Sequence, residues 1–452
     1  MSGVEAIFEP SSVILIGSTK IRERVGLSSP QLFESVIHNM KKFFKGEVYI
    51  RDVDREREQN IEALPKVPEL AVFMLPPDKS LTEAEIWAKI GVKAFIMITG
   101  GYKDDQRLKL LKLKEMYGVR ILGPNTVMGV INTANGLNTT FEKDLMPKMG
   151  SIAVISQSGG VGACLLDWAC HYKIGISKFA FMGDKIDVDD IDLLQYLAKD
   201  RETKVICLYM EGVKNGREFI EEARKIVVEK PILALKGGIT QESAHRAKSH
   251  TASMAGSDEI FSAAFKKAGI IRVEDPEELM NAAIALSKQP PMFGDDIAIV
   301  SNVGGPAILA ADAVARNELK LARLSYETKR KIESLYPGVD ATNPIDIIAD
   351  ARADRFKKVL ELVLADENVD GVLVINMLKS CFLEPEDAKV IPEVAFKYSD
   401  KPVIDVAAGG EDFELVYGVI GESNIPVYNL PEKGVKALKI LRIYGKIIEK
   451  KG

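Results

Sequence analysis

The segment "GSIAVISQSGGVGACLLDWACHYKIG" (150–175) closely matches "DIAIVSNVGGPAILAADAVARNELK" (296–320). Each begins with an apolar run, continues through a turn of small residues with paired glycines, and ends in a helical pattern. Apolar runs of four to six residues bounded by glycine predict strands buried on both faces of a parallel sheet. An internal repeat of this kind indicates that the same α/β arrangement occurs twice in this half of the chain.

The alternation of apolar strands and helical patterns extends to the N-terminal part of the chain. There the helical pattern at 80–91 is an example of a crossover helix between two parallel strands. Further strands are expected within 12–20, 47–53, 70–77, 94–101 and 119–125, and, around the repeat, within 204–212, 231–238, 369–377 and 401–410. This order predicts an α/β protein with three doubly wound units, at about 1–128, 147–288 and 292–452. The Pro- and Gly-rich segment 287–296 is the expected linker between the second and third units. The boundary between the first and second units, within the polar and irregular segment 129–150, is less sharply defined.

Composition excludes several classes of protein. The 60 Lys and Arg nearly balance 65 Asp and Glu, so no nucleic-acid partner is expected. Four cysteines without CxxC spacing predict neither a zinc site nor a disulfide framework. There is no leader pattern at the N-terminus and no apolar run of about 18 residues, so we expect a soluble, cytoplasmic protein that does not contact a membrane.

The first turn, "IGSTKIRERVG" (16–26), follows a strand and is expected to open a helix near Ser28 or Ser29. Backbone amides at such a helix start can bind phosphate, and Lys20, Arg22 and Arg24 would suit a ligand with more than one phosphate group. The turn is not a GxGxxG dinucleotide fingerprint, which weakens a role for Asp52 in holding the ribose of NAD. The alternative is a solvated loop.

A second turn, "ISQSGGVGA" (155–163), contains serines before a glycine pair. The register differs from the GxSxG nucleophile elbow, so a serine hydrolase is not predicted. A helix start with hydroxyls at Ser156 and Ser158 predicts an anion site, and close packing of the helix on the sheet is the alternative.

Five aspartates at 184, 187, 189, 190 and 192 are crowded into "GDKIDVDDIDLLQYL" (183–197). Their order does not match a calcium-binding loop. A charged helix start explains them, because acidic residues are favoured in the first turn of a helix. No metal site is predicted.

His245 and His250 lie in "AHRAKSHTASMAG" (244–256), a segment of small residues. Their spacing fits no zinc motif. A histidine in a small loop suits covalent phosphoryl transfer, because imidazole is a good nucleophile near neutral pH. Glu211, at the end of "ICLYMEG", is the candidate to accept a hydrogen bond from the other ring nitrogen. A structural histidine is the alternative.

Together these motifs resemble one family over almost the whole chain: the α subunits of archaeal ADP-forming acetyl-CoA (acyl-CoA) synthetases, NDP-forming relatives of succinyl-CoA synthetase. The resemblance implies a CoA-binding Rossmann-like domain followed by two flavodoxin-like ligase domains. "SHTASMAG" (249–256) resembles the phosphohistidine loop, with Ala252 where the family usually has glycine. By this match His250 is the phosphohistidine, and Glu211 is the glutamate that contacts it.

The resemblance also implies binding residues. For phosphate these are Ser156, Ser158, Gly159, Gly160, Gly123, Pro124 and Asn125. For CoA they are Gly17, Ser18, Thr19, Lys20, Arg22, Val25, Gly26, Pro76, Pro77, Thr99 and Gly100. The first loop lacks the proline that is usual in the family, so the individual CoA contacts are less well specified than the domain.

The implied reaction is acyl-CoA + ADP + phosphate ⇌ carboxylic acid + CoA + ATP, through an enzyme-bound acyl phosphate and the phosphohistidine. The chain has no Walker A motif and no room for an ATP-grasp fold. The resemblance therefore implies a separate ATP-grasp β subunit in an α2β2 assembly, which would bind ADP or ATP and Mg²⁺. The acyl group is not specified by the sequence. The alternatives are a catalytically silent CoA-binding or regulatory subunit, an NAD-dependent oxidoreductase, and a CoA-dependent protein acetyltransferase, which would need an appended domain.

Overall fold

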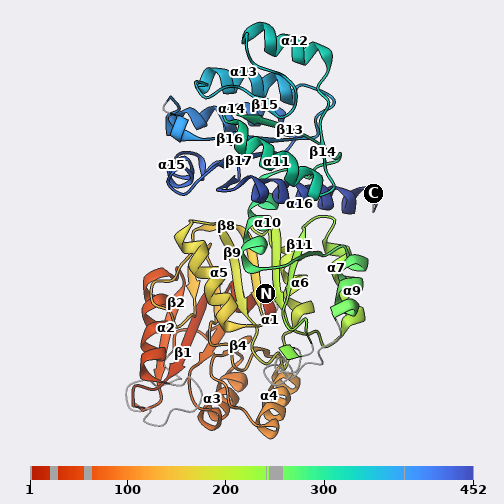
Figure 1. The fold of residues 1–452 in the computed structure, drawn as a ribbon. Helices are drawn as coiled ribbons and strands as arrows, with labels where there is room; N and C mark the ends of the chain where they lie inside the picture. Colours follow the sequence, from red (N-terminus) through yellow and green to blue (C-terminus); the bar gives the residue numbers. More distant parts are fainter. Residues whose placement is uncertain are drawn as a thin grey trace. The chain divides into compact units, whose positions relative to one another are not determined.

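The computed structural model describes residues 3–20, 29–54, 64–240, 242–243, 258–380 and 382–450. The chain forms two compact units, residues 1–279 and 280–452, and the division falls within helix α10 (Pro276–Lys288). The chain contains three sheets that are mainly parallel, and helices pack against them (Figure 1). The predicted α/β class is therefore confirmed. No helix in the described ranges is long and apolar enough to cross a membrane.

The first sheet is wholly parallel, with strand order β2-β1-β3-β4-β5. Its strands are β1 (Ser12–Gly17), β2 (Glu47–Asp52), β3 (Leu70–Phe73), β4 (Ala94–Met97) and β5 (Arg120–Leu122), and its helices are α1 (Gly3–Phe8), α2 (Pro30–Phe43), α3 (Pro77–Ile90) and α4 (Asp104–Tyr117). β1, β3 and β4 are buried along their whole length, as expected for strands covered on both faces. Ser29 caps α2 by accepting a hydrogen bond from the Leu32 amide, which confirms the predicted helix start.

The second sheet has the order β12-β11-β10-β8-β9-β6-β7. Its strands are β6 (Val130–Asn132), β7 (Leu137–Asn138), β8 (Met149–Ser156), β9 (Ile176–Phe181), β10 (Val205–Met210), β11 (Ile232–Lys236) and β12 (Ile271–Val273), with helices α5 (Gly159–His171), α6 (Asp190–Lys199), α7 (Gly216–Ile226) and α9 (Asp258–Ala268) besides α10. β6 and β7 are antiparallel and extend the sheet beyond β9. This sheet therefore begins near residue 130, earlier than the predicted start of the second unit at 147.

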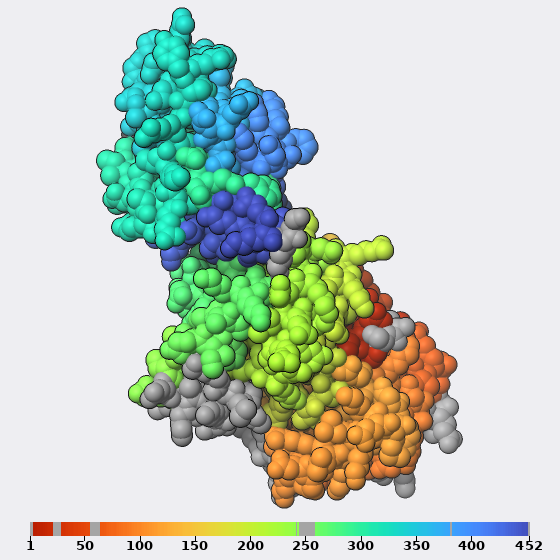
Figure 2. Space-filling model, turned by 90° about the vertical axis from the view of Figure 1, so that its right-hand side faces the viewer, coloured from red at the N-terminus to blue at the C-terminus, as the bar shows by residue number. Residues whose placement is uncertain are grey.

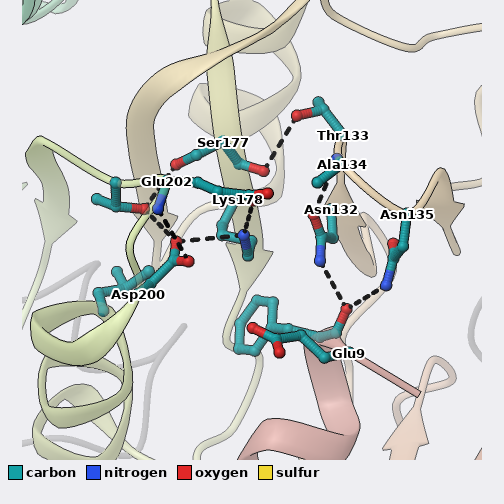
Figure 3. A network of polar contacts seen from close by, with 12 residues as sticks. Glu9, Asn132, Thr133, Ala134, Asn135, Ser177, Lys178, Asp200 and Glu202 are labelled. Atoms are coloured by element: carbon teal, nitrogen blue, oxygen red, sulfur yellow. Dashed lines mark hydrogen bonds and ion pairs between the residues drawn. The ribbon is translucent and has the colours of Figure 1, made fainter. Parts of the chain in front are cut away.

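Helix α1 connects the first sheet to the second within the first unit. The carbonyl oxygen of Phe8 accepts hydrogen bonds from the side-chain amides of Asn132 and Asn135, both at 2.9 Å (Figure 3). The ring of Phe8 stacks on that of Tyr196, with centroids 4.6 Å apart. In Figure 2 the orange and yellow-green parts of the chain, which belong to the regions of the first and second sheets, adjoin on the surface of this unit.

A buried lysine supports the amino edge of the second sheet. Lys178 is 2% exposed and lies 3.2 Å from Asp200 and 2.6 Å from Glu202 (Figure 3). Nearby, the hydroxyls of Ser177 and Thr203 are 2.7 Å apart. These contacts join β9 to the segment that leads into β10, at the edge opposite the predicted site.

The third sheet belongs to the second unit and has the order β14-β13-β16-β17-β18, with β15 paired to β13. Its strands are β13 (Asp296–Ser301), β14 (Lys320–Leu321), β15 (Ile345–Asp346), β16 (Gly371–Asn376), β17 (Val403–Ala407) and β18 (Val427–Tyr428). Its helices are α11 (Gly304–Arg316), α12 (Tyr326–Leu335), α13 (Ala353–Leu364), α14 (Val390–Ala395), α15 (Glu411–Ile420) and α16 (Pro431–Glu449), with short 3₁₀ turns η2 (Leu378–Ser380), η3 (Pro385–Lys389) and η4 (Phe396–Tyr398). The strands predicted around the repeat are confirmed.

The predicted linker, 287–296, is not a free connection. Gln289 accepts a hydrogen bond from the Val403 amide at 2.7 Å and donates to the Asn424 carbonyl at 2.6 Å. Met292 is fully buried, and its amide bonds to the Leu441 carbonyl. The segment is therefore packed into the second unit in spite of its prolines and glycine, because its side chains and amides find partners there.

Candidate active site

The turn after β8 has the predicted form of a helix start. Ser158 is the N-cap of α5 and accepts from the Val161 amide, while the buried Ser156 hydroxyl donates to the Ser158 carbonyl at 2.7 Å. A side chain added at Gly160 would meet no atom within 4 Å. Gly160 is also exposed, and a helix N-terminus favours an anion at such a position.

Glu211 follows β10, the strand next to β8 in the sheet. The Tyr209 hydroxyl donates to Glu211 Oε1 at 3.3 Å. Burial, together with the negative charge of Glu211, raises the pKa of Tyr209 to about 12. The other oxygen, Oε2, is buried and has no hydrogen-bond partner in the part of the chain that the structure describes. One carboxylate oxygen is thus available to a further donor.

The loop Gly123–Pro124–Asn125 lies at the carboxyl edge of the first sheet and contacts the loop that follows β9. The Asp184 amide donates to the Pro124 carbonyl at 2.8 Å, and the Ile186 amide donates to the Gly123 carbonyl at 3.1 Å. Gly123 has φ of +104°, a conformation that favours glycine.

This loop also lies near the start of α5. A side chain added at Gly159 would approach Val127, two residues beyond Asn125, to 3.5 Å. The predicted phosphate-binding residues from the two sheets are therefore brought into one neighbourhood.

The described residues of the first predicted CoA turn, Gly17 to Lys20, are held by two aspartates. The Thr19 hydroxyl donates to Asp52 at 2.6 Å, and the Ser18 hydroxyl donates to Asp54. The hydrogen bond from Ser18 lowers the pKa of Asp54. The close approach of Phe33 leaves no room for a side chain at Gly17. The turn is thus fixed by its own contacts.

The other predicted CoA residues also lie at the carboxyl edge of the first sheet. Pro76 and Pro77 begin α3. The buried Thr99 hydroxyl donates to the Leu75 carbonyl at 2.6 Å, and Gly100 lies directly against Asn125. Four turns of this edge, including that of Gly17, are therefore formed by residues predicted to bind CoA or phosphate.

The acidic segment 183–197 is explained by ion pairs and a helix cap. Asp189 is the N-cap of α6, which confirms the predicted helix start. Asp187 pairs with Arg120 and Lys114; burial alone would raise its pKa, but these hydrogen bonds outweigh burial and lower it. Asp184 pairs with Arg107 at 2.7 Å. These pairs tie α4 and β5 of the first sheet to the second sheet.

Several predicted residues lie outside the described ranges, namely His250, Arg22, Val25 and Gly26. Three buried residues at the same edge were missed by the sequence prediction: Gln157, Asp190 and Lys185, which are 5%, 4% and 3% exposed. One signal could have found Gln157, because both copies of the repeat carry a side-chain amide at this position, Gln157 and Asn302.

A polar cavity of about 840 Å³ lies elsewhere in the first unit, between α1 and α6, with Glu9, Arg120 and Glu202 in its lining. None of the predicted site residues that the structure describes lines it. The chemistry-bearing residues converge instead at the carboxyl edges of the first two sheets, which is where ligands bind in open α/β sheets.

The fold and this edge define an α/β protein with mainly parallel sheets and a candidate ligand site at the carboxyl ends of its strands. Residues 149–286 match the family described as the succinyl-CoA ligase like flavodoxin domain. The chain is 34% identical to the protein named acetate–CoA ligase (ADP-forming) II subunit alpha of Pyrococcus furiosus, over 95% of each chain. It is 37% identical to acetate–CoA ligase (ADP-forming) of Methanocaldococcus jannaschii, over 96% of this chain and 62% of that protein.

Among solved structures, the chain is similar to that described as the dinucleotide forming acetyl-coenzyme A synthetase 1 of Ca. Korarchaeum cryptofilum in complex with phosphate and ADP. The TM-score is 0.88 at 30% identity, with 99% of this chain and 98% of that chain covered. The chain therefore belongs to the family of α subunits of ADP-forming acetate–CoA ligases.

Proposed function

We propose that this chain is the α subunit of an NDP-forming acyl-CoA synthetase, which interconverts acyl-CoA, ADP and phosphate with a carboxylic acid, CoA and ATP. The similarity to the P. furiosus α subunit along almost the whole of both chains is the observation that carries this proposal. CoA would bind at the carboxyl edge of the first sheet, through the turns that contain Gly17, Pro76 and Thr99.

In the first step, an oxygen of inorganic phosphate attacks the carbonyl carbon of the thioester. The C–S bond breaks, CoA leaves as the thiol after it takes a proton, and the acyl phosphate stays bound. The amides of Gly159 and Gly160, at the N-terminus of α5, would stabilise the phosphate charge, because donors fixed in advance need no reorganisation during the reaction.

In the second step, an imidazole nitrogen of His250 attacks the phosphorus. The bond from phosphorus to the acyl oxygen breaks and the carboxylate leaves, which produces a phosphohistidine. Glu211 would accept a hydrogen bond from the other ring nitrogen and stabilise the positive charge that develops on the ring. The buried Oε2 of Glu211, which has no hydrogen-bond partner within the described ranges, supports this role.

In the third step, a terminal phosphate oxygen of ADP attacks the phosphorus, the P–N bond breaks and ATP forms. We assign ADP and Mg²⁺ mainly to a separate ATP-grasp β subunit in an α2β2 assembly. The M. jannaschii relative supports this assignment, because 38% of that longer protein lies beyond the part that this chain covers, which leaves room for a further domain.

The test is a coupled assay on the complex of this chain with a candidate β subunit. ATP formation from acetyl-CoA or another acyl-CoA, ADP and phosphate is expected, and His250→Ala should abolish it. If no acyl-CoA supports ATP formation although CoA binds, the chain is a silent CoA-binding subunit. If a titration shows NAD bound in place of CoA, the chain is an oxidoreductase.

A further inference from the structure

The side chain of Gln157 is a buried clamp on the segment that carries Glu211. Its Oε1 accepts from the amides of Glu211 and Gly212, at 2.8 and 3.1 Å. Its Nε2 donates to Asp190 Oδ1 at 2.7 Å and to the Gly212 carbonyl at 2.9 Å. An amide side chain has two donor hydrogens and two acceptor lone pairs, so all of its hydrogen bonds are used and its orientation is fixed.

Lys185 extends this clamp to a third loop. Its Nζ donates to Asp190 Oδ2 at 2.8 Å and to the Gly212 carbonyl at 3.0 Å. The side chains of Lys185 and Asp190 are 3% and 5% exposed. The network therefore joins the loops that follow β8, β9 and β10, at the edge where the phosphate-binding residues converge.

The desolvation cost of this buried network indicates that it has a role besides stabilising the fold. Burying an ion pair removes both charges from water, so such a pair is weak support for stability even when its geometry is good. Here Asp190 and the Gly212 carbonyl each accept hydrogen bonds from both Gln157 and Lys185. Gln157 Oε1 also accepts from the two successive backbone amides of Glu211 and Gly212. This segment carries the Glu211 carboxylate, whose Oε2 has no hydrogen-bond partner among the described residues.

We infer that Gln157, Asp190 and Lys185 are positioning residues for Glu211 and that they act on phosphoryl transfer through its carboxylate. The inference rests on the proposed function of Glu211. Residues that orient a catalytic or ligating group from behind typically change activity by about 10–100-fold when they are removed. Gln157→Ala should lower the rate of phosphoryl transfer by a factor in that range, because the segment loses three of its hydrogen bonds.

The test is a double-mutant cycle in the complex with the β subunit. The rate of ATP formation is measured for wild type, Gln157→Ala, Glu211→Gln and the double variant. If Gln157 acts through Glu211, its removal costs about 10–100-fold in the wild-type background but only about two- to threefold in the Glu211→Gln background, because effects of residues that act as a unit are not additive.

Asn39 offers a matched control. It is a fully buried amide that accepts from the Asp144 amide at 3.0 Å and donates to the carbonyls of Thr140 and Glu142. Asn39→Ala should show no coupling to Glu211→Gln. If Gln157→Ala costs the same factor in both backgrounds, the network supports the site in general and the inference is wrong. If Glu211→Gln alone has wild-type activity, it is the proposed role of Glu211 that fails.

A second pair of variants keeps the inference testable if Gln157→Ala does not fold. Lys185→Met and Lys178→Met each remove the cation of a buried ion pair in the second sheet, at opposite edges. Both should lower the midpoint of thermal unfolding. Only Lys185→Met should also lower the rate of phosphoryl transfer per folded molecule. Equal rates for the two variants would overturn the inference.

Discussion

The turn after β8 in the second sheet and the turn after β13 in the third make closely matching hydrogen bonds. The Ser156 hydroxyl donates to the Ser158 carbonyl at 2.7 Å, and the Ser301 hydroxyl donates to the Val303 carbonyl at the same distance. The amide residue that follows each serine, Gln157 or Asn302, uses its side chain to bind the loop after the neighbouring strand. The sequence repeat therefore corresponds to a structural repeat, in which the two turns share individual hydrogen bonds.

The difference lies in what the clamped loop carries. Gln157 Oε1 accepts from the amide of Glu211, whereas Asn302 Oδ1 accepts from the amide of Met377 at 3.0 Å. Only the first of these positions has a carboxylate. The repeat thus specifies the same scaffold twice, and in the proposed function the Glu211 carboxylate is the feature of this turn that only the second-sheet copy has.

The largest effect should come from exchanging the side chain that distinguishes the two copies. Glu211→Gln keeps the shape but removes the charge, so phosphoryl transfer should fall by about 10²–10³-fold, as when a fixed group that stabilises developing charge is lost. Met377→Gln, the matched change in the third sheet, should alter the rate by less than about threefold, because it removes no charge and Met377 has no part in the proposed reaction. Rates of ATP formation in the complex check both, and equal losses would break the comparison.

A buried acid in the third sheet should produce a pH dependence of stability. Burial raises the pKa of Asp405 to about 8, and the hydrogen bond from Asn376 offsets only part of this. Between about pH 4 and pH 8 the folded state therefore holds a proton that the unfolded state has lost. The free energy of unfolding should fall as pH rises through this window, by at most about 1.4 kcal/mol per pH unit, and should level off above it.

Asp405→Asn should remove this contribution, because the amide is neutral at every pH. Urea unfolding of wild type and variant at pH 5, 7 and 9 measures it, with the transition of the second unit identified as the one that the substitution moves. A wild-type slope that survives in Asp405→Asn would show that another group titrates.

The smallest effect concerns the helix caps of the two turns. Ser158 accepts from an amide of α5, whereas Val303 at the start of α11 makes no side-chain cap. Ser158→Val should lower the free energy of unfolding by about 1 kcal/mol, and Val303→Ser should raise it by up to a similar amount. Thermal unfolding of the two variants checks this reciprocal exchange, and a shift in the same direction for both would contradict it.

Much of the scaffold could be predicted because its signals are local. Strands such as β1 and β16 are short apolar runs bounded by glycine or turn residues, and the helix cap at Ser29 follows from a serine before a proline. β6 and β7 could not be predicted, because two- and three-residue strands have no periodicity and the antiparallel pairing of β6 with β9 joins segments that are distant in sequence.

The clamp on Glu211 could not be predicted for a different reason. Gln157 and the Gly212 carbonyl are 55 residues apart, and nothing in either local sequence indicates the contact. The helix start in the acidic segment could be predicted, but the cations that its aspartates meet could not, because Asp187 pairs with the distant Arg120 and Asp190 with Lys185. The sequence identified the carboxylate at Glu211 but not the network that holds it.

We propose that the second-sheet copy carries phosphoryl-transfer chemistry that the third-sheet copy lacks. The most direct measurement is labelling of the α–β complex with acyl-CoA and radiolabelled phosphate, followed by mass spectrometric localisation of the phosphoryl group. We predict an acid-labile, alkali-stable label on His250 that disappears in His250→Ala and forms much more slowly in Glu211→Gln than in Met377→Gln. Absence of label with a panel of acyl-CoAs, or a label that forms equally fast in these two variants, would contradict it.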